Sequence, residues 1–354
     1  MSHSERKIDL RNLTFEQMET FFSGHGLTTG RTRQVFSWLS RPEVHSFAQM
    51  TDIKKEARDL LDKYACISFL QTEAIEQSTD GTIKFGFRLA DGAIIESVLI
   101  PGENRYTLCV SSQVGCAMGC AFCLTAQMGF VRNLRPGEIV GQVMAVLLYM
   151  VGQGIERATP REFINNLVFM GMGEPLANYD NLIVALRILM DERGLEFTER
   201  RVTVSTCGLT PKIAALGKEI RVNLAISLHA ADNQTRDLLM PVNRTYPLEG
   251  LIRACREFPL SRKKVILIAY ILMKGVNDSV ADAEKLGRLL QGISCRINLL
   301  PYNESSGSAY RCSDQETIDR FRRVLHDYGL LSLVRESRGA DISAACGQLA
   351  TSAQ

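Results

Sequence analysis

The stretch Gly115-Cys116-Ala117-Met118-Gly119-Cys120-Ala121-Phe122-Cys123 decides how the rest of the chain is organised. It follows a strand-like run at residues 106–110, so three cysteines spaced C-x3-C-x2-C lie on a tight loop after a strand. Thiolates on such a loop can converge on one point, where they suit either zinc or iron-sulfur chemistry. A structural zinc site normally has four protein ligands, and no cysteine or histidine follows nearby to complete one. A cubane cluster held by three cysteines leaves one iron open to another ligand, while a zinc knuckle remains the alternative.

Composition indicates an ordinary globular protein with no membrane segment. The 354 residues are 45% hydrophobic and 23% charged, and the longest apolar run, at residues 143–151, is too short to cross a bilayer. The N-terminus lacks the apolar core of a signal peptide, which predicts a cytoplasmic protein. In that compartment the ten cysteines serve as ligands, catalysts or buried thiols more readily than as a disulfide framework. The net charge of +2 neither requires nor excludes a nucleic-acid partner.

Two small parts precede the main domain. Residues 1–72 carry helical patterns, beginning with a capping box in which Thr14 is the N-cap and Gln17 its partner, and predict a helical accessory domain. Several basic residues of this domain could contact phosphates or simply form a solvated face: Arg31, Arg33, Lys54, Lys55 and Arg58. Residues 73–101 change to a period of two between turn signals, which predicts a β-meander.

Residues 102–338 alternate strand and helix patterns and predict an α/β fold with a parallel sheet. The strand-like runs are residues 106–110, 167–170, 201–205, 222–228, 265–272 and 296–300. Six βα units are fewer than the eight of a complete barrel, so we expect a partial (β/α)6 TIM-like barrel. Residues 339–354 then form a separate C-terminal segment.

The carboxyl ends of these strands carry unusual residues, most of them polar, as the functional face of a barrel does. They are Gly173, Glu174, Ser205, Ser227, Leu228, His229 and Asn303. Each also has an ordinary explanation, because a glycine-rich stretch can be a turn, Ser and Asn can cap helices, and a histidine on an apolar strand is usually a satisfied core residue.

Two further residues are out of place in their surroundings. Glu96 lies between apolar residues of a predicted strand, where it must find a partner, reach a cavity or take up a proton, unless the strand is an exposed edge. Cys346 lies on a glycine-containing segment near the chain end, where it is either incidental or a mobile nucleophile.

Together these segments resemble the bacterial radical S-adenosylmethionine (SAM) enzymes that methylate carbon 2 of adenosine in ribosomal and transfer RNA. The resemblance covers nearly the whole chain and includes the aromatic Phe122 and four runs: residues 50–53, 109–113, 125–127 and 344–349. It implies that Cys116, Cys120 and Cys123 hold a 4Fe-4S cluster. It also implies that Cys346 is methylated, that Cys109 is its resolving partner and that Glu96 is the proton acceptor. The implied SAM-binding residues are Gly173, Glu174, Ser205, Ser227, Leu228, His229 and Asn303.

The implied reaction explains why two extra cysteines are needed. Carbon 2 of adenine is electrophilic and cannot attack a sulfonium methyl group directly, so Cys346 first takes a methyl from one SAM molecule. A radical generated from a second SAM molecule removes hydrogen from that S-methyl group, and the thiomethylene radical adds to carbon 2. After loss of an electron and a proton, Cys109 attacks the sulfur of Cys346, which releases methylated RNA and leaves a disulfide to be reduced.

The resemblance also implies partners and leaves alternatives. Its targets are an adenosine in the peptidyl-transferase centre of 23S rRNA and the adenosine 3′ of a tRNA anticodon. An electron donor such as flavodoxin or ferredoxin is expected, and the protein is expected to be a monomer that does not bind membranes. A related enzyme methylates carbon 8 of the same rRNA adenosine with the same cysteines, although residues 124–130 look more like the carbon-2 group. A non-catalytic zinc and RNA-binding protein is the alternative from another class.

Overall fold

The predicted helical segment at the N-terminus forms a separate bundle in the computed structural model, which describes residues 7–155, 159–261, 264–304 and 308–350. Helices α1 (Phe15–Gly24), α2 (Thr29–Leu39) and α3 (Lys55–Tyr64) enclose their own cluster of buried apolar side chains. The predicted capping box at Thr14 and Gln17 is confirmed at the start of α1. Short strands β1 (Ile8–Asp9) and β2 (Ala65–Cys66) pair in parallel where the chain enters and leaves the bundle.

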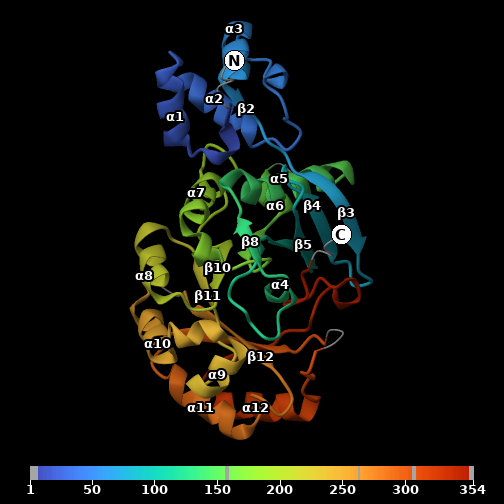
Figure 1. Cartoon of the computed structure of the whole chain (residues 1–354), viewed down its shortest axis with the longest axis vertical. Helices are drawn as coiled ribbons and strands as arrows, with labels where there is room; N and C mark the ends of the chain where they lie inside the picture. Colours follow the sequence, from blue (N-terminus) through green and yellow to red (C-terminus); the bar gives the residue numbers. More distant parts are fainter. Residues whose placement is uncertain (1–6, 156–158, 262–263, 305–307, 351–354) are drawn as a thin grey trace.

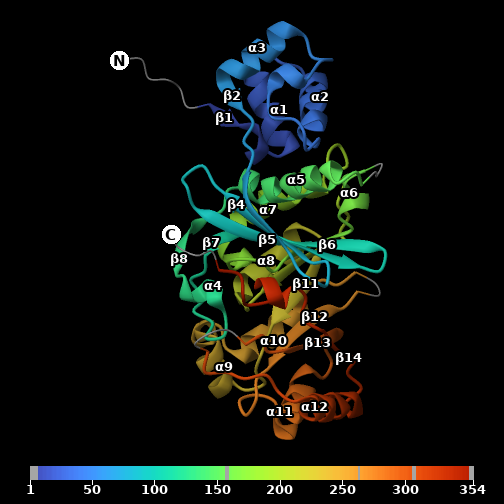
Figure 2. The same ribbon diagram turned by 90° about the vertical axis from the view of Figure 1, so that its right-hand side faces the viewer.

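The bundle packs on one end of the main domain, as Figures 1 and 2 show. The Asn12 side-chain oxygen accepts a hydrogen bond of 2.8 Å from the backbone N–H of Gly137, at the start of α5 (Pro136–Gly152). On the other side, the guanidinium of Arg193 lies 3.6 Å from the centre of the Phe15 ring and 3.1 Å from a carboxylate oxygen of Glu16. Polar and cation–π contacts thus hold the bundle against the barrel.

One ten-stranded sheet organises the described part of the main domain, in the order β14-β13-β12-β11-β10-β9-β6-β5-β4-β3. Pairing is antiparallel from β3 to β6 and parallel from β6 to β14, so the predicted meander and the predicted barrel share one sheet. Its strands are β3 (Gln71–Gln77), β4 (Ile83–Arg88), β5 (Ile94–Gly102), β6 (Arg105–Cys109), β9 (Asn166–Phe169), β10 (Val202–Thr206), β11 (Asn223–Ser227), β12 (Ile266–Leu272), β13 (Cys295–Pro301) and β14 (Ser332–Val334).

The six strands expected from the sequence are β6 and β9 to β13, and the α/β partial-barrel prediction is confirmed. The short seventh parallel strand, β14, was not predicted, because three half-buried residues show no clear period. A small two-stranded ribbon, β7 (Gln113–Gly115) and β8 (Phe130–Asn133), was also missed. It closes the loop that carries the three cysteines.

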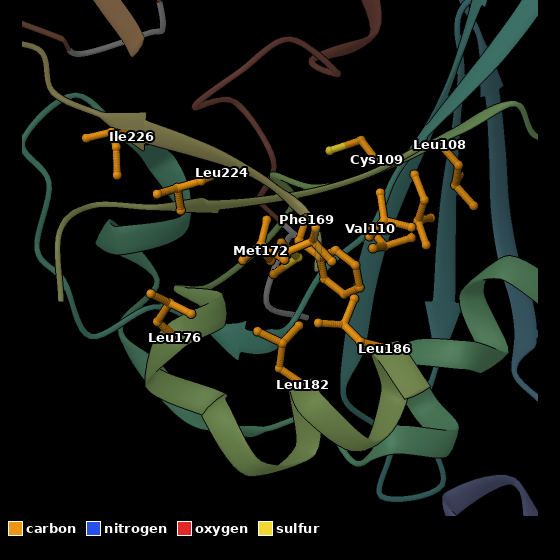
Figure 3. Packing of buried hydrophobic residues seen from close by; sticks show 14 of the residues in the cluster. Leu108, Cys109, Val110, Phe169, Met172, Leu176, Leu182, Leu186, Leu224 and Ile226 are labelled. Atoms are coloured by element: carbon orange, nitrogen blue, oxygen red, sulfur yellow. The ribbon is translucent and has the colours of Figure 1, made fainter. Parts of the chain in front are cut away.

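Helices follow the strands and cover the sheet with apolar faces. In Figure 3, Leu182 and Leu186 of α7 (Tyr179–Met190) point toward Phe169, whereas Cys109 lies on the other side of its strand. The remaining α-helices are α4 (Leu124–Gln127), α6 (Pro160–Phe163), α8 (Thr210–Glu219), α9 (Asn233–Leu239), α10 (Leu248–Glu257), α11 (Val280–Leu290) and α12 (Gln315–Asp327). The 3-10 turns are η1 (Leu10–Asn12), η2 (Phe47–Gln49), η3 (Pro175–Asn178), η4 (Pro241–Arg244) and η5 (Ala340–Ile342). Among the described helices, none is both long and apolar enough to cross a membrane.

Candidate active site

A cavity of about 170 Å³ lies where the carboxyl ends of the parallel strands meet the cysteine loop. Its walls come from the loop after β7, the ends of β9, β10 and β11, and the C-terminal segment. The sequence-predicted residues that line it are Cys116, Cys120, Cys123, Gly173, Glu174, Ser205, Ser227, His229 and Cys346. Segments far apart in the sequence therefore converge on one space, as expected for the functional face of a barrel.

The ribbon of β7 and β8 shapes the cysteine loop. Gly115 has a φ of +71°, and a Cβ atom there would lie 1.8 Å from the carbonyl oxygen of Gly129. That same oxygen accepts a hydrogen bond of 2.9 Å from the backbone N–H of Cys116. At its far end, Ala121 donates a backbone hydrogen bond of 2.9 Å to Leu239 of α9. Only glycine allows this close approach, which turns the three cysteine side chains toward the cavity.

The three thiols provide a donor set that fits an iron-sulfur cluster. All are free cysteines in the walls of one cavity, and burial raises the pKa of Cys116 to about 11 and that of Cys120 further. Metal binding would therefore have to displace their protons. Among the described residues, no group of three or more His, Cys, Asp or Glu side chains is arranged to hold a metal ion. A cubane differs from a single ion because its own sulfides and irons span the space between the cysteine ligands.

Glu174 places a buried carboxylate in the cavity wall. Its Oε1 accepts a hydrogen bond of 2.9 Å from the backbone N–H of Leu176, and its Oε2 accepts one of 2.8 Å from that of Cys207. Burial raises the pKa of Glu174, although these hydrogen bonds oppose the shift. A buried carboxylate of this kind is stabilised by a cationic ligand, and the ammonium group of SAM has the required charge. The cavity thus fits both groups that the sequence predicts.

His229 lies at the end of β11 in a left-handed conformation, with φ of +58°. Its Nδ1 accepts a hydrogen bond of 3.1 Å from the backbone N–H of Ile271, and its ring meets Phe122 edge-on with centroids 4.9 Å apart. Burial, together with the nearby Arg236 charge, lowers the pKa of His229 to about 3. The imidazole is therefore neutral, and its Nδ1 has a hydrogen-bond partner, as in a core histidine. The ring also lines the cavity.

Two predicted SAM-binding residues lie outside the lining of this cavity. Leu228 is fully buried, and its carbonyl oxygen accepts a hydrogen bond of 3.1 Å from Arg236. Asn303 lines a neighbouring cavity of about 150 Å³. Its side-chain nitrogen donates a hydrogen bond of 3.2 Å to the carbonyl oxygen of Cys346, which lines both cavities. The structure therefore separates these two residues from the rest of the predicted set.

Cys346 and Cys109 approach each other from different elements. Cys346 is on the C-terminal segment, which lies beside α4 in Figure 1 and is joined to it by a backbone hydrogen bond of 2.8 Å from Leu124 to Gly347. Cys109 is buried at the end of β6, and its pKa is raised by burial and by the neighbouring thiol of Cys346. Both are free thiols. Cys346 thus lines the cavity, whereas Cys109 is buried outside its lining.

Glu96 is buried on β5, only 7% exposed, so the alternative of an exposed edge glutamate is wrong. It lies outside the lining of the central cavity. Its Oε1 is 3.4 Å from the ammonium nitrogen of Lys84, whereas its buried Oε2 has no hydrogen-bond partner among the described residues. Burial raises the pKa of Glu96, and the charge of Lys84 opposes the shift.

Sequence reasoning missed the residues that support the cavity from behind. Arg236 of α9 is fully buried and donates hydrogen bonds of 2.6 Å to the carbonyl oxygen of Cys207 and 2.9 Å to the side-chain oxygen of Asn243. Gln113 accepts a hydrogen bond of 2.8 Å from the backbone N–H of Glu174. The available signal for Arg236 and Gln113 was a polar residue at a position where the pattern predicts an apolar one. Polar residues are common on surface helices, so this signal alone does not indicate a buried support.

Comparisons with known proteins identify the class to which this fold and cavity belong. The family model of the radical SAM superfamily matches residues 110–286, which contain the cysteine loop and most of the parallel strands. A crystal structure of a radical SAM methyltransferase from Sphaerobacter thermophilus superposes with a TM-score of 0.89 at 42% identity, covering 97% of this chain and 99% of that one. The fold and its three-cysteine cavity define a radical SAM enzyme.

Individual relatives identify the family within the radical SAM enzymes. The dual-specificity RNA methyltransferase RlmN of Desulfotalea psychrophila is 49% identical, covering 98% of this chain and 96% of its own, and that of Geobacter sulfurreducens is 52% identical, covering 97% and 92%. A second family model, the N-terminal domain of a ribosomal RNA large-subunit methyltransferase, matches residues 8–67. The chain belongs to the dual-specificity RNA methyltransferase RlmN family.

Proposed function

We propose that this enzyme places a methyl group on carbon 2 of adenosine in 23S rRNA, at the peptidyl-transferase centre, and in tRNA, at the adenosine 3′ of the anticodon. The convergence of Cys346 with the three-cysteine cavity and with Cys109 is the observation that supports this most. An ordinary methyltransferase needs no thiol of its own, whereas transfer through a methylated cysteine needs one thiol to carry the group and another to release it.

Each predicted residue has a role in this proposal. Cys116, Cys120 and Cys123 would hold the 4Fe-4S cluster. When bound, the cluster and two SAM molecules per turnover supply the methyl group and the radical that activates it. Glu174 would bind the ammonium group, and Gly173, Ser205, Ser227 and His229, which line the same cavity, would surround the ligand. Leu228 and Asn303 would contribute from the edges of this site, Leu228 through its contact with the supporting Arg236 and Asn303 through its hydrogen bond to the backbone of Cys346.

Three residues of the chain then act on the RNA. The Cys346 thiolate takes up the methyl group as a thioether, and the carbon of that group, once activated, forms the bond to carbon 2. Glu96 accepts the proton from carbon 2. Cys109 attacks the sulfur of Cys346 to break the carbon–sulfur bond, so the two cysteines end as a disulfide and the carbon ends as a methyl group after taking up a proton.

We propose that the helical domain, residues 1–72, binds RNA. Arg33, Lys54 and Lys55 are exposed on it, and Arg31 is half-buried beside Gln34. Phosphate contacts from such side chains position a nucleic acid without reading its sequence. Deletion of the domain should therefore weaken RNA binding without loss of iron, whereas unchanged affinity would remove this role. In the proposed division, residues 73–101 are the meander, 102–338 the barrel and 339–354 the methyl-carrying segment.

The decisive experiment is nucleoside mass spectrometry of 23S rRNA and tRNA from a host that lacks the modification. The RNAs are incubated anaerobically with reconstituted enzyme, SAM and a reductant. We expect 2-methyladenosine in both RNAs, and the two yields report the substrate preference. Formation of 8-methyladenosine alone would show that the base is held in the other orientation and would overturn the carbon-2 assignment.

Metal analysis distinguishes the proposed iron-sulfur enzyme from a zinc protein. Iron with acid-labile sulfide is expected, whereas zinc without sulfide would support a non-catalytic RNA-binding protein.

Flavodoxin and ferredoxin are the proposed electron donors, and either should replace the chemical reductant. We propose a monomer located in the cytoplasm, where both RNAs occur, and sedimentation of the reconstituted protein tests the first point.

A further inference from the structure

A chain of ion pairs leads from Glu96 to the edge of the sheet. The ammonium nitrogen of Lys84 lies 3.4 Å from Oε1 of Glu96 and 3.0 Å from Oε1 of Glu76. The side chains of Lys84 and Glu96 are each 9% exposed, whereas that of Glu76 is 49% exposed. Burying a charged lysine and carboxylate costs desolvation free energy, so the position of this ion pair calls for a functional reason.

The strand register places these residues beside Cys109. In the antiparallel ladders, Glu76 of β3 is opposite Lys84 of β4, Lys84 is opposite Val98 of β5, and Val98 is opposite Cys109 of β6. Residues opposite each other in such ladders point to the same face, and Glu96 shares that face because it is two residues from Val98. The charged chain and the Cys109 thiol therefore lie on one face of the sheet.

Glu96 has one oxygen held and one oxygen free. Lys84 contacts Oε1, while Oε2 is buried and has no hydrogen-bond partner among the described residues. The C-terminal segment lies over this point, since the backbone N–H of Ala350 faces the carboxylate and the carbonyl of the preceding residue accepts a hydrogen bond from Thr125. The charged groups that face Glu96 are thus Lys84 from β4 and, beyond it, Glu76 from β3.

We propose that Lys84, itself held by Glu76, is the positioning residue that favours the ionised form of Glu96 and fixes one of its oxygens, so that Oε2 can accept the proton of carbon 2. This inference rests on the proposed function, because it assigns a support to the base of that reaction. Burial raises the pKa of Glu96 and so disfavours the ionised form that accepts a proton. The fixed ammonium group opposes that shift and orients one oxygen, so that the other remains available.

The step that Lys84 supports is a single proton transfer. The cluster that Cys116, Cys120 and Cys123 would hold would supply the one-electron oxidation of the RNA adduct. In the oxidised adduct, the carbon–hydrogen bond at carbon 2 breaks. Its electron pair stays in the purine ring, and the proton goes to Oε2 of Glu96. Lys84 keeps its own proton throughout, which is why an arginine at this position should serve the same purpose.

The test is the pH dependence of product release in a single turnover, begun with enzyme already methylated on Cys346. Activity rises with pH as the base ionises, so the acid limb reports the pKa of Glu96. In Lys84→Met, the loss of a cation within about 4 Å should move this limb to higher pH by about one to three units. Lys84→Arg should restore the midpoint. Lys84→Gln provides a second neutral variant if the methionine disturbs packing.

Glu76→Gln is the matched control because it removes a charge of the opposite sign from the same chain of ion pairs. The Glu76 charge raises the pKa of Glu96, so its removal should leave the acid limb in place or move it to lower pH. A purely structural role would lower the melting temperature of the Lys84 and Glu76 variants without moving the acid limb to higher pH in the neutral Lys84 variants. Iron content and methylation of Cys346 should be unchanged in all of them.

The outcomes separate this inference from the proposed function. If Glu96→Gln releases product at the wild-type rate, the assignment of Glu96 as the base is wrong and both proposals lose that step. If Glu96→Gln blocks release while Lys84→Met and Lys84→Gln keep the wild-type midpoint, only the role of Lys84 is overturned. An alkaline shift in both neutral variants that is reversed by arginine supports it.

Discussion

The hydroxyl of Ser78 donates a hydrogen bond of 2.6 Å to the carboxylate of Asp341, which joins the turn between β3 and β4 to the segment that carries the C-terminal cysteine. The backbone N–H of Thr79 donates a second hydrogen bond to the same carboxylate, at 3.1 Å, and Asp80 accepts one from the backbone N–H of Gly339. The antiparallel meander thus anchors the C-terminal segment on one side, while α4 holds it on the other.

Loss of this anchor should misplace Cys346. Asp341→Asn keeps the size of the side chain but replaces one acceptor oxygen with a donor, so it cannot keep all three hydrogen bonds that the turn donates, one to Oδ1 and two to Oδ2. We expect Cys346 to react several-fold faster with iodoacetamide and to take up methyl from SAM several-fold more slowly. Mass spectrometry of the labelled peptide measures both. Ser78→Ala should have a similar effect, and unchanged rates in the two variants would contradict the anchor.

Replacement of Cys346 should stop the reaction without removing the cluster. Cys346→Ala has no thiol to carry a methyl group, so no methylated adenosine should form, whereas the three cysteines of the loop after β7 are untouched. Nucleoside mass spectrometry measures the first effect, and iron and sulfide content measure the second. A variant that still turns over would rule out transfer through this cysteine.

Replacement of Cys109 should trap the reaction at a later stage. In Cys109→Ala the methyl group is loaded and added to RNA, but the nearby thiol that would attack the sulfur of Cys346 is absent. We expect a covalent protein–RNA species that nuclease digestion shortens. Its absence from reacted samples, checked beside the Cys346→Ala protein as a negative control, would argue against the resolving role.

The buried His229 should make the apo-protein sensitive to mild acid. Burial lowers its pKa from 6.5 to about 3, so the unfolded chain binds a proton that the folded chain does not. The free energy of unfolding should therefore fall by up to about 1.4 kcal/mol for each pH unit below 6.5, until the folded-state pKa is reached. Urea unfolding of the wild type and of His229→Gln between pH 7.5 and 5 is the measurement, at roughly one-unit steps. Parallel pH curves for the two proteins would contradict this account.

The close approach at Gly115 should make cluster binding sensitive to one methyl group. In Gly115→Ala the new Cβ would lie 1.8 Å from the Gly129 carbonyl oxygen, in a left-handed conformation that alanine rarely adopts. The ribbon must open, and iron content after reconstitution should fall several-fold. Gly152→Ala is the control, because a Cβ there meets no atom within 4 Å, and it should retain the iron. Equal iron in both variants would show that the ribbon does not shape the loop.

Much of the fold could be predicted because its signals are local. The capping box at Thr14, the alternation in residues 83–89 and the repeated strand and helix patterns all reflect neighbours along the chain. Short elements could not be predicted in the same way. The strand β14 and the ribbon of β7 and β8 contain three or four residues each and are stabilised by partners distant in the sequence.

The sequence by itself determined the chemistry available to this protein: three thiols on one loop, two further cysteines, and carboxylates among apolar residues. Tertiary structure alone decided which of them meet. It brings Cys346 beside Cys109 across more than half of the chain, leaves Asn303 outside the central cavity, and pairs Glu96 with Lys84. The physical reason is that residue type sets reactivity locally, whereas distance, burial and counter-charge arise only when strands remote in sequence share one sheet.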